Sequence, residues 1–163
     1  MKKLTFLALC IFTLISCKKS VLSTPSSIEY KVNGSLVQIT GGRDYSSQSS
    51  VFGVDLGPYV YKSYGSGYYS ITGLETTYGA SIAIGTGHDS LQTKTYTGGT
   101  LSVNFVVNNV SYGIINIQDS ILVNITRYSS GSIDGTFSGS FSHDSLNRIS
   151  VTEGKLNNLK VYF

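Results

Sequence analysis

From Ile28 to the C-terminus, the chain alternates apolar with polar residues and shows no helical periodicity. Alternation of this kind predicts half-buried β-strands, because successive side chains of a strand point to opposite faces of the sheet. The pair Asn33-Gly34 between two such runs favours a type I′ turn, in which both central residues need a positive φ. The chain contains 18 glycines, many of which interrupt the alternation where turns are expected.

The strand candidates recur at the short, regular spacing that is typical of all-β domains. We therefore predict one domain over residues 28–163, an antiparallel β-sandwich or a partly closed β-barrel of about ten strands. A helix fits only in short pieces such as Lys155–Leu159. The expected strands are Ile28–Val32, Ser35–Thr40, Val51–Leu56, Tyr59–Tyr64, Tyr68–Leu74, Ala80–Gly85, Thr100–Val107, Val110–Ile117, Ile121–Tyr128, Ser132–Phe141 and Ser150–Phe163.

The first sixteen residues have the pattern of a secretory signal peptide. Lys2 and Lys3 precede an apolar run over residues 4–15, which is shorter than the roughly 20 residues that a membrane-spanning helix needs. The sequence LISC at residues 14–17 resembles the lipobox of bacterial lipoproteins. That resemblance implies cleavage before Cys17 and attachment of lipid to its thiol and new amino terminus. The alternative is an ordinary signal peptide with an incidental cysteine.

The predicted organisation has three parts: residues 1–16 as signal peptide, residues 17–27 as lipidated cysteine and Ser-rich tether, and residues 28–163 as the domain. Cys10 and Cys17 are the only cysteines, so the domain has no disulfide and no thiolate ligand. We expect a protein anchored by lipid to a membrane of the cell envelope, at the outer membrane. The sequence leaves open whether the domain faces the periplasm or the cell surface.

The charge of the domain argues against nucleic acid as a partner. Four of the 12 Lys and Arg residues precede residue 28, whereas all 9 acidic residues follow it, which leaves eight basic against nine acidic groups and a net charge of −1 for residues 28–163. No basic patch and no nucleic-acid-binding motif is present. The aspartates mostly lie beside Gly or Ser, as turn acids do. They are Asp44, Asp55, Asp89, Asp119, Asp134 and Asp144.

The tetrapeptide HDSL occurs twice and contains the only two histidines, His88 and His143. A catalytic triad within one copy is implausible, because neighbouring strand side chains diverge. A triad drawn from both copies is possible, but the sequence lacks a nucleophile-elbow motif. If the two loops meet, His88, Asp89, His143 and Asp144 provide a tetrahedral zinc shell. Each copy lies between expected strands, and Asp and Ser favour turns. We therefore prefer a turn used twice, with no cofactor.

The two HDSL copies match over a longer stretch when aligned at an offset of 55 residues. Thr97, Gly99 and Leu101 then correspond to a second T-x-G-x-L sequence at residues 152–156. The repeated unit is expected to be a hairpin connection, after which Leu91 and Leu146 return to the core.

Five tyrosines lie within residues 59–69. They are Tyr59, Tyr61, Tyr64, Tyr68 and Tyr69. Tyrosine offers a large contact area and a polar hydroxyl, so this cluster is a candidate surface for a glycan or protein ligand. The alternative, which we favour, is ordinary cross-strand packing. Alternation places Tyr59 and Tyr61 on one face and Tyr64 on the other.

The C-terminal half contains two motifs, ILVNITRYSSGSIDGTFSGSF and RISVTEGKLNNLKVYF. Together with KVNGS near the start of the domain, they resemble uncharacterised lipoproteins of Bacteroidota. The matching positions are Ile125, Thr126, Arg127, Tyr128, Gly135, Thr136, Phe137, Thr152, Gly154 and Lys155, while Leu156 stands where that family usually has Phe. The resemblance implies an all-β lipoprotein of unknown activity and supplies no catalytic residues.

These observations favour a non-enzymatic lipoprotein that acts as a binding or structural β-module. The alternative is an envelope enzyme or metal-binding protein that uses the loop residues His88, Asp89, His143 and Asp144. The distance between the two histidines separates the two hypotheses.

Overall fold

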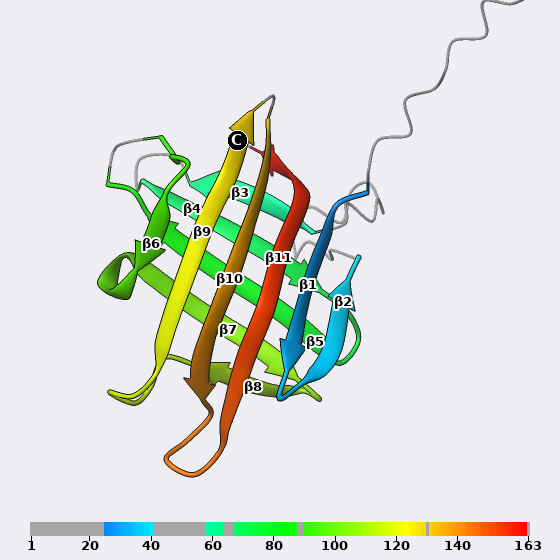
Figure 1. The fold of residues 1–163 in the computed structure, drawn as a ribbon, viewed down its shortest axis with the longest axis vertical. Helices are drawn as coiled ribbons and strands as arrows, with labels where there is room; N and C mark the ends of the chain where they lie inside the picture. The colour runs from blue at the N-terminus through cyan, green and yellow to red at the C-terminus, as the bar shows by residue number, and fades with distance from the viewer. Residues whose placement is uncertain (1–24, 41–57, 64–66, 88–89, 130, 163) are drawn as a thin grey trace, which may run out of the picture.

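The computed structural model describes residues 25–40, 58–63, 67–87, 90–129 and 131–162, which form one eleven-stranded sheet and one short 3-10 helix (Figure 1). The elements are β1 (Ser27–Val32), β2 (Ser35–Ile39), β3 (Tyr59–Ser63), β4 (Tyr68–Leu74), β5 (Tyr78–Gly85), β6 (Thr95–Thr97), η1 (Gly98–Thr100), β7 (Leu101–Val107), β8 (Val110–Gly113), β9 (Ser120–Ser129), β10 (Ser132–Ser142) and β11 (Arg148–Tyr162). The all-β prediction is confirmed. The expected strand Val51–Leu56 and Cys17 lie outside the described residues.

The strands form two layers that cross at an angle in Figure 1. The front layer has the order β6-β9-β10-β11-β1-β2, and the rear layer has the order β3-β4-β5-β7-β8. The layers join at two corners, where β11 pairs with β3 and where Ser142 of β10 pairs with Gly113 of β8. The sheet therefore closes into a ring, and the fold lies between a sandwich and a barrel, as the sequence predicted.

One pairing departs from the predicted antiparallel pattern. Residues 160–162 at the end of β11 run parallel to residues 59–61 of β3. Strand β11 is 15 residues long, whereas its neighbour β1 pairs only with residues 151–157. The last residues of β11 therefore extend past β1 and leave a free edge for β3.

The suggested helix at Lys155–Leu159 is wrong, because these residues belong to β11. Lys155 lies between Glu29 of β1 and Thr136 of β10, and pairing on both sides of a central strand outweighs local helix propensity. Two smaller differences remain. The strand predicted over Val110–Ile117 ends at Gly113, and the short strand β6 was not predicted.

The core between the layers is centred on aromatic rings. Phe105 lies 4.8 Å from Phe141, 5.8 Å from Phe137 and 5.4 Å from Tyr30, measured between ring centroids. The Tyr30 hydroxyl donates a hydrogen bond to the Gly79 carbonyl oxygen (3.4 Å), and burial raises the pKa of this tyrosine. The buried apolar residues of the described chain extend from Ile28 to Val161, so the described strands enclose a hydrophobic core of their own.

Glycine is required where β11 passes Phe137. A Cβ atom at Gly154 would lie 2.4 Å from the Phe137 carbonyl oxygen and 2.6 Å from its ring. The close approach of β10 and β11 therefore depends on the absence of a side chain at Gly154. Gly154 and Phe137 are two of the positions at which the sequence resembles the uncharacterised lipoproteins, and this contact is a packing reason for both residues.

Candidate functional site

The second HDSL copy forms the tight connection between β10 and β11. Asp144 Oδ1 accepts hydrogen bonds from the backbone N–H groups of Leu146 and Asn147 (2.8 Å each), and its Oδ2 accepts one from Asn147 Nδ2 (2.7 Å). The hydrogen bond from the Asn147 side chain, followed by the two backbone bonds, lowers the pKa of Asp144. This arrangement confirms that residues 143–146 form a turn.

His143 holds this turn against the neighbouring strand. Its Nδ1–H donates to the Ser111 carbonyl oxygen of β8 at 2.9 Å, and its ring lies 5.9 Å from that of Tyr112. Among the described residues, no three His, Cys, Asp or Glu side chains are grouped to hold a metal ion. His88 and Asp89 lie outside the described residues, so the four-residue metal site stays a prediction.

The two HDSL copies differ in their surroundings. Leu91 is 2% exposed and belongs to the core as expected, whereas Leu146 is 91% exposed, so the expectation that it returns to the core is wrong. The first copy belongs to a connection from β5 in the rear layer to β6 in the front layer, and Leu91 joins the core between them. The second copy turns at the end of a hairpin, where Leu146 meets solvent. The T-x-G-x-L sequences differ likewise, since one spans β6, η1 and β7 and the other lies within β11.

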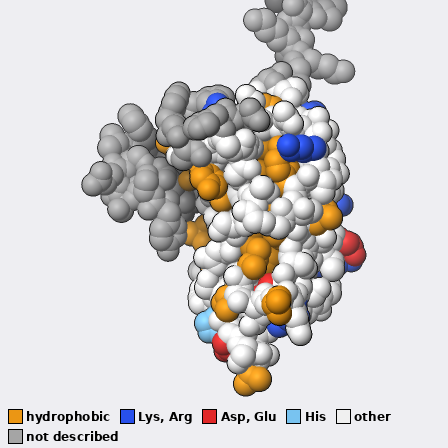
Figure 2. Space-filling view, turned by 90° about the vertical axis from the view of Figure 1, so that its left-hand side faces the viewer, with side chains coloured by type: hydrophobic (Ala, Val, Ile, Leu, Met, Phe, Trp, Pro, Cys, Tyr) orange, Lys and Arg blue, Asp and Glu red, His pale blue; other side chains and the backbone are white. Residues whose placement is uncertain are grey.

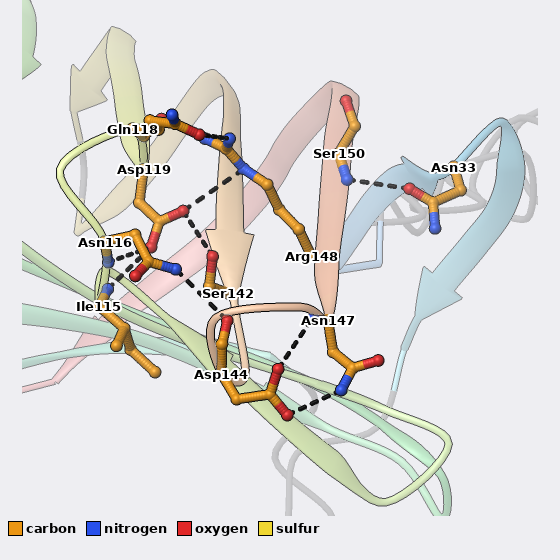
Figure 3. A network of polar contacts seen from close by, with 10 residues as sticks. All are labelled: Asn33, Ile115, Asn116, Gln118, Asp119, Ser142, Asp144, Asn147, Arg148 and Ser150. Carbon is orange, nitrogen blue, oxygen red and sulfur yellow. Dashed lines mark hydrogen bonds and ion pairs between the residues drawn. The ribbon is translucent and has the colours of Figure 1, made fainter.

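A buried carboxylate organises the adjacent loop between β8 and β9 (Figure 3). Asp119 Oδ2 accepts hydrogen bonds from the backbone N–H groups of Ile115 (2.8 Å) and Asn116 (2.7 Å). Its Oδ1 accepts one from Ser142 Oγ (2.8 Å) and lies 3.4 Å from Arg148 Nε. The Asp119 side chain is 0% exposed. One carboxylate thus connects its own loop to β10 and β11.

The surroundings of Asp119 favour its charged form. Burial raises its pKa, but the hydrogen bonds from Asn116, Ile115 and Ser142 and the charge of Arg148 outweigh burial, so the pKa is lowered. The Arg148 guanidinium also donates to the side-chain oxygen (3.1 Å) and the carbonyl oxygen of Gln118. This ion pair is therefore embedded in a hydrogen-bonded network.

The two loops are joined to each other. Asn116 Nδ2 donates to the Asp144 carbonyl oxygen (3.3 Å), and Figure 3 shows this bond between the Asp119 network and the HDSL turn. We call residues 114–119 together with residues 143–147 the distal tip. From the sequence, Asp119 is recognisable only as a turn acid, because its partners lie on other strands.

The distal tip presents apolar side chains to solvent. Ile117 and Leu146 are almost fully exposed, Ile115 is more than half exposed, and Ile114 is less than half exposed. In Figure 2, hydrophobic side chains lie at the lower end of the molecule close to a histidine, shown in pale blue. Hydrogen bonds thus fix the backbone of the distal tip, while aliphatic side chains form part of its outer surface.

The tip lies far from the start of the domain. Strand β11 begins at the tip with Arg148, and Ser27 at the start of β1 pairs with Asn157. Nine residues of strand separate these two positions of β11, which corresponds to about 30 Å. Figure 1 accordingly shows the start of β1 at the upper end and the β10–β11 turn at the lower end.

The predicted tyrosine surface is divided by the sheet. Tyr59 and Tyr61 lie together on the outer face of β3, and Tyr68 lies on the outer face of β4. Tyr69 is 0% exposed, so it does not belong to a ligand surface; its position next to Tyr68 in the strand turns it into the core. Tyr64 lies outside the described residues.

The part of the chain that the structure describes contains no helix long and apolar enough to cross a membrane. The chain matches no protein-family model, no curated protein and no solved structure.

Proposed function

We propose that this chain is a lipid-anchored, non-enzymatic binding module of the cell envelope whose distal tip docks into an aliphatic-lined site on a protein partner. The observation that carries the proposal is the combination of exposed aliphatic side chains and a braced backbone at the tip. The lipid anchor rests on the lipobox-like sequence that ends at Cys17 and on the resemblance to bacterial lipoproteins.

Exposed aliphatic side chains favour association with an apolar surface. Burying an isoleucine or leucine side chain completely contributes roughly 1.5–3 kcal/mol, so Ile117 and Leu146 together offer about 3–6 kcal/mol before the costs of association. Part of that cost is the ordering of flexible loops. The hydrogen bonds of Asp119 and Asp144 order both loops in advance, which leaves more of the burial energy for binding.

The position of the tip argues for a partner other than the membrane that holds the anchor. The predicted anchor at Cys17 is close in sequence to the start of β1, and the start of β1 lies roughly 30 Å from the tip along β11. The tip therefore faces away from the anchoring bilayer. A protein that lies beyond the domain is within its reach.

The described residues offer no observation in favour of the alternative, an envelope enzyme or metal-binding protein. The Asp144 carboxylate is engaged by N–H groups of its own turn, and His143 Nδ1 is engaged by the Ser111 carbonyl oxygen of β8. The binding module is therefore the better proposal.

The proposal is tested by site-specific photo-crosslinking in cells that express the full-length protein. A photoreactive amino acid at Ile117 or Leu146 is expected to yield the same protein adduct. The same group at Leu36 or Leu122, which are exposed on the outer face of the front layer, serves as the matched control. An Asp119→Ala change in the Leu146-labelled protein should reduce the adduct, because it releases the loop bracing. No adduct from the tip, or equal adducts from all four positions, would contradict the proposal.

A further inference from the structure

The outer surface where β11 meets β3 carries a row of exposed tyrosines. In β3, Tyr61 points outward and Val60 is fully buried, as expected from alternation. Tyr162 is the parallel neighbour of Tyr61 in register, and its neighbour Val161 also faces the core. The same alternation turns Tyr68 outward on β4. The exposed fractions are 38% for Tyr162, 46% for Tyr61 and 51% for Tyr68.

These three residues form a line across three neighbouring strands. Tyr162 and Tyr61 lie on paired strands about 4.8 Å apart. Tyr68 pairs with Ser63, two residues after Tyr61, which places Tyr61 and Tyr68 at the diagonal spacing of roughly 7–8 Å. We call Tyr162, Tyr61 and Tyr68 the tyrosine row.

Contacts within the sheet hold the ends of the row in place. The ring of Tyr59 meets that of Tyr162 edge to face, with centroids 5.9 Å apart and an interplanar angle of 81°. Tyr68 is paired with Gly85, and a Cβ atom built on this glycine would lie 3.1 Å from the Tyr68 ring. The ring of Tyr68 therefore lies over the space left by the glycine and keeps its other face toward solvent.

Among the described residues, the surface around the row is polar and has one charged side chain at its border. The outward residues that follow the row on β4, Ser70 and Thr72, have hydroxyl groups 3.4 Å apart. Ser63 and Ser81 add hydroxyls on the neighbouring strands β3 and β5. Lys160, next to Tyr59 on β11, places a cation at the border of this surface. Aromatic faces and hydroxyl groups thus alternate over a sheet surface with little charge.

We propose that the tyrosine row is a binding site for a neutral oligosaccharide. The C–H groups on the face of a sugar ring are attracted to the electron-rich face of an aromatic ring, and the hydroxyls at the rim of the sugar exchange hydrogen bonds with Tyr and Ser hydroxyls. A line of rings across three strands suits an extended chain of sugar units. The low charge of the surface matches a ligand without carboxylate or sulfate groups.

The tyrosine row is separate from the distal tip. Tyr162 follows Arg148 by fourteen residues of strand, which places the two sites about 45 Å apart along β11. The row lies at the end of β11 that is remote from the tip. A lipid-anchored module would therefore contact a glycan and a protein partner at opposite ends, and neither site depends on the other.

The inference is tested with full-length protein reconstituted into liposomes and a panel of soluble polysaccharides. The neutral probes are glucan, mannan, xylan and galactan, and a polyuronate serves as the anionic probe. Co-flotation with the liposomes measures binding. We expect at least one neutral probe to bind, and we expect Tyr61→Ala and Tyr162→Ala each to weaken that binding about ten-fold. Tyr61→Phe should retain most of it, because the ring remains. Leu36→Ala, at an exposed leucine of β2 outside the row, is the matched control.

Three results would overturn the inference. The first is that no neutral probe binds the wild-type protein. The second is that Tyr61→Ala and Leu36→Ala bind a probe equally well while their unfolding temperatures equal that of the wild type. The third is preferential binding of the polyuronate that is lost in Lys160→Ala, which would assign the surface to an anionic ligand.

Discussion

Replacing Asp119 by alanine should destabilise the domain, although Asp119 lies in a loop. The change removes the acceptor of two backbone N–H groups and of the Ser142 hydroxyl, and it removes the partner of Arg148. A carboxylate with a side chain 0% exposed and four donors around it behaves as a buried charge that is fully compensated. Without the Asp119 carboxylate, these donors either bind water or stay without a hydrogen-bond acceptor.

The expected magnitude follows from what each donor can do after the change. Ile115 is exposed, so water can reach its N–H group, whereas the buried Ser142 loses a hydrogen bond worth about 1–3 kcal/mol. Arg148 keeps its hydrogen bonds to Gln118 and is not left as an isolated charge. The Arg148 side chain is 37% exposed, so the ion pair is only partly buried, and we expect a loss of about 2 kcal/mol in the free energy of unfolding, mostly from the lost hydrogen bonds.

Urea unfolding at pH 7 measures this loss, with Ser142→Ala as a control that removes one hydrogen bond and should cost about 1 kcal/mol. The pKa of Asp119 is lowered in the folded state. Its contribution is therefore fully present above the unfolded pKa of about 3.9 and is lost as the pH falls through the lower folded value. The difference between wild type and Asp119→Ala should accordingly shrink between pH 5 and pH 2. A loss below about 1 kcal/mol at pH 7, or a difference that does not shrink with acid, would contradict a stabilising role of the Asp119 carboxylate.

Three further predictions concern the core, a strand crossing and the anchor. Among the described residues, the Tyr69 hydroxyl is buried without a hydrogen-bond partner, so Tyr69→Phe should leave the stability of the domain unchanged or raise it by about 1 kcal/mol. Tyr30→Phe removes a hydroxyl that is hydrogen-bonded, so it should lower the stability. The unfolding temperatures of the two variants measure this difference. Gly154→Ala should cost about 2 kcal/mol or more, and Gly99→Ala, where a Cβ atom meets nothing within 4 Å, should cost less than about 0.5 kcal/mol in the same urea assay. Cys17→Ser should release the protein from the membrane fraction, and a free thiol at Cys17 in the mass spectrum of the mature wild-type protein would contradict lipidation.

Local features of the fold could be predicted because they depend on a few adjacent residues. Asn33 and Gly34 adopt positive φ values of 49° and 88° and join β1 and β2 in a two-residue turn, because these two residue types tolerate the positive φ that the turn requires. The alternation of Tyr59 and Tyr61 likewise determined that both lie on one face of β3. The HDSL turn followed from the tendency of Asp144 to accept hydrogen bonds from the N–H groups that follow it.

The candidate sites could be predicted only in part, because each brings together residues that are far apart in the sequence. Tyr162 joins Tyr61 only through the parallel pairing of β11 with β3, and no local pattern specifies which strands become neighbours. Asp119 looks like an ordinary turn acid until Ser142 and Arg148 are placed beside it. Alternation places Tyr68 and Tyr69 on opposite faces of β4, but it does not say which face meets the core. The folded domain shows that Tyr69 is the buried one.

The all-β class, the main turns and the two faces of each strand therefore follow from the sequence, since backbone preferences and a two-residue period establish them. Which element packs against each face depends on how the strands pair in the folded domain. The two copies of HDSL demonstrate the difference, because the same four residues place Leu91 in the core and Leu146 in solvent. The physical reason is that burial of a side chain depends on which layer lies opposite it, and that is a property of strand pairing over the whole chain.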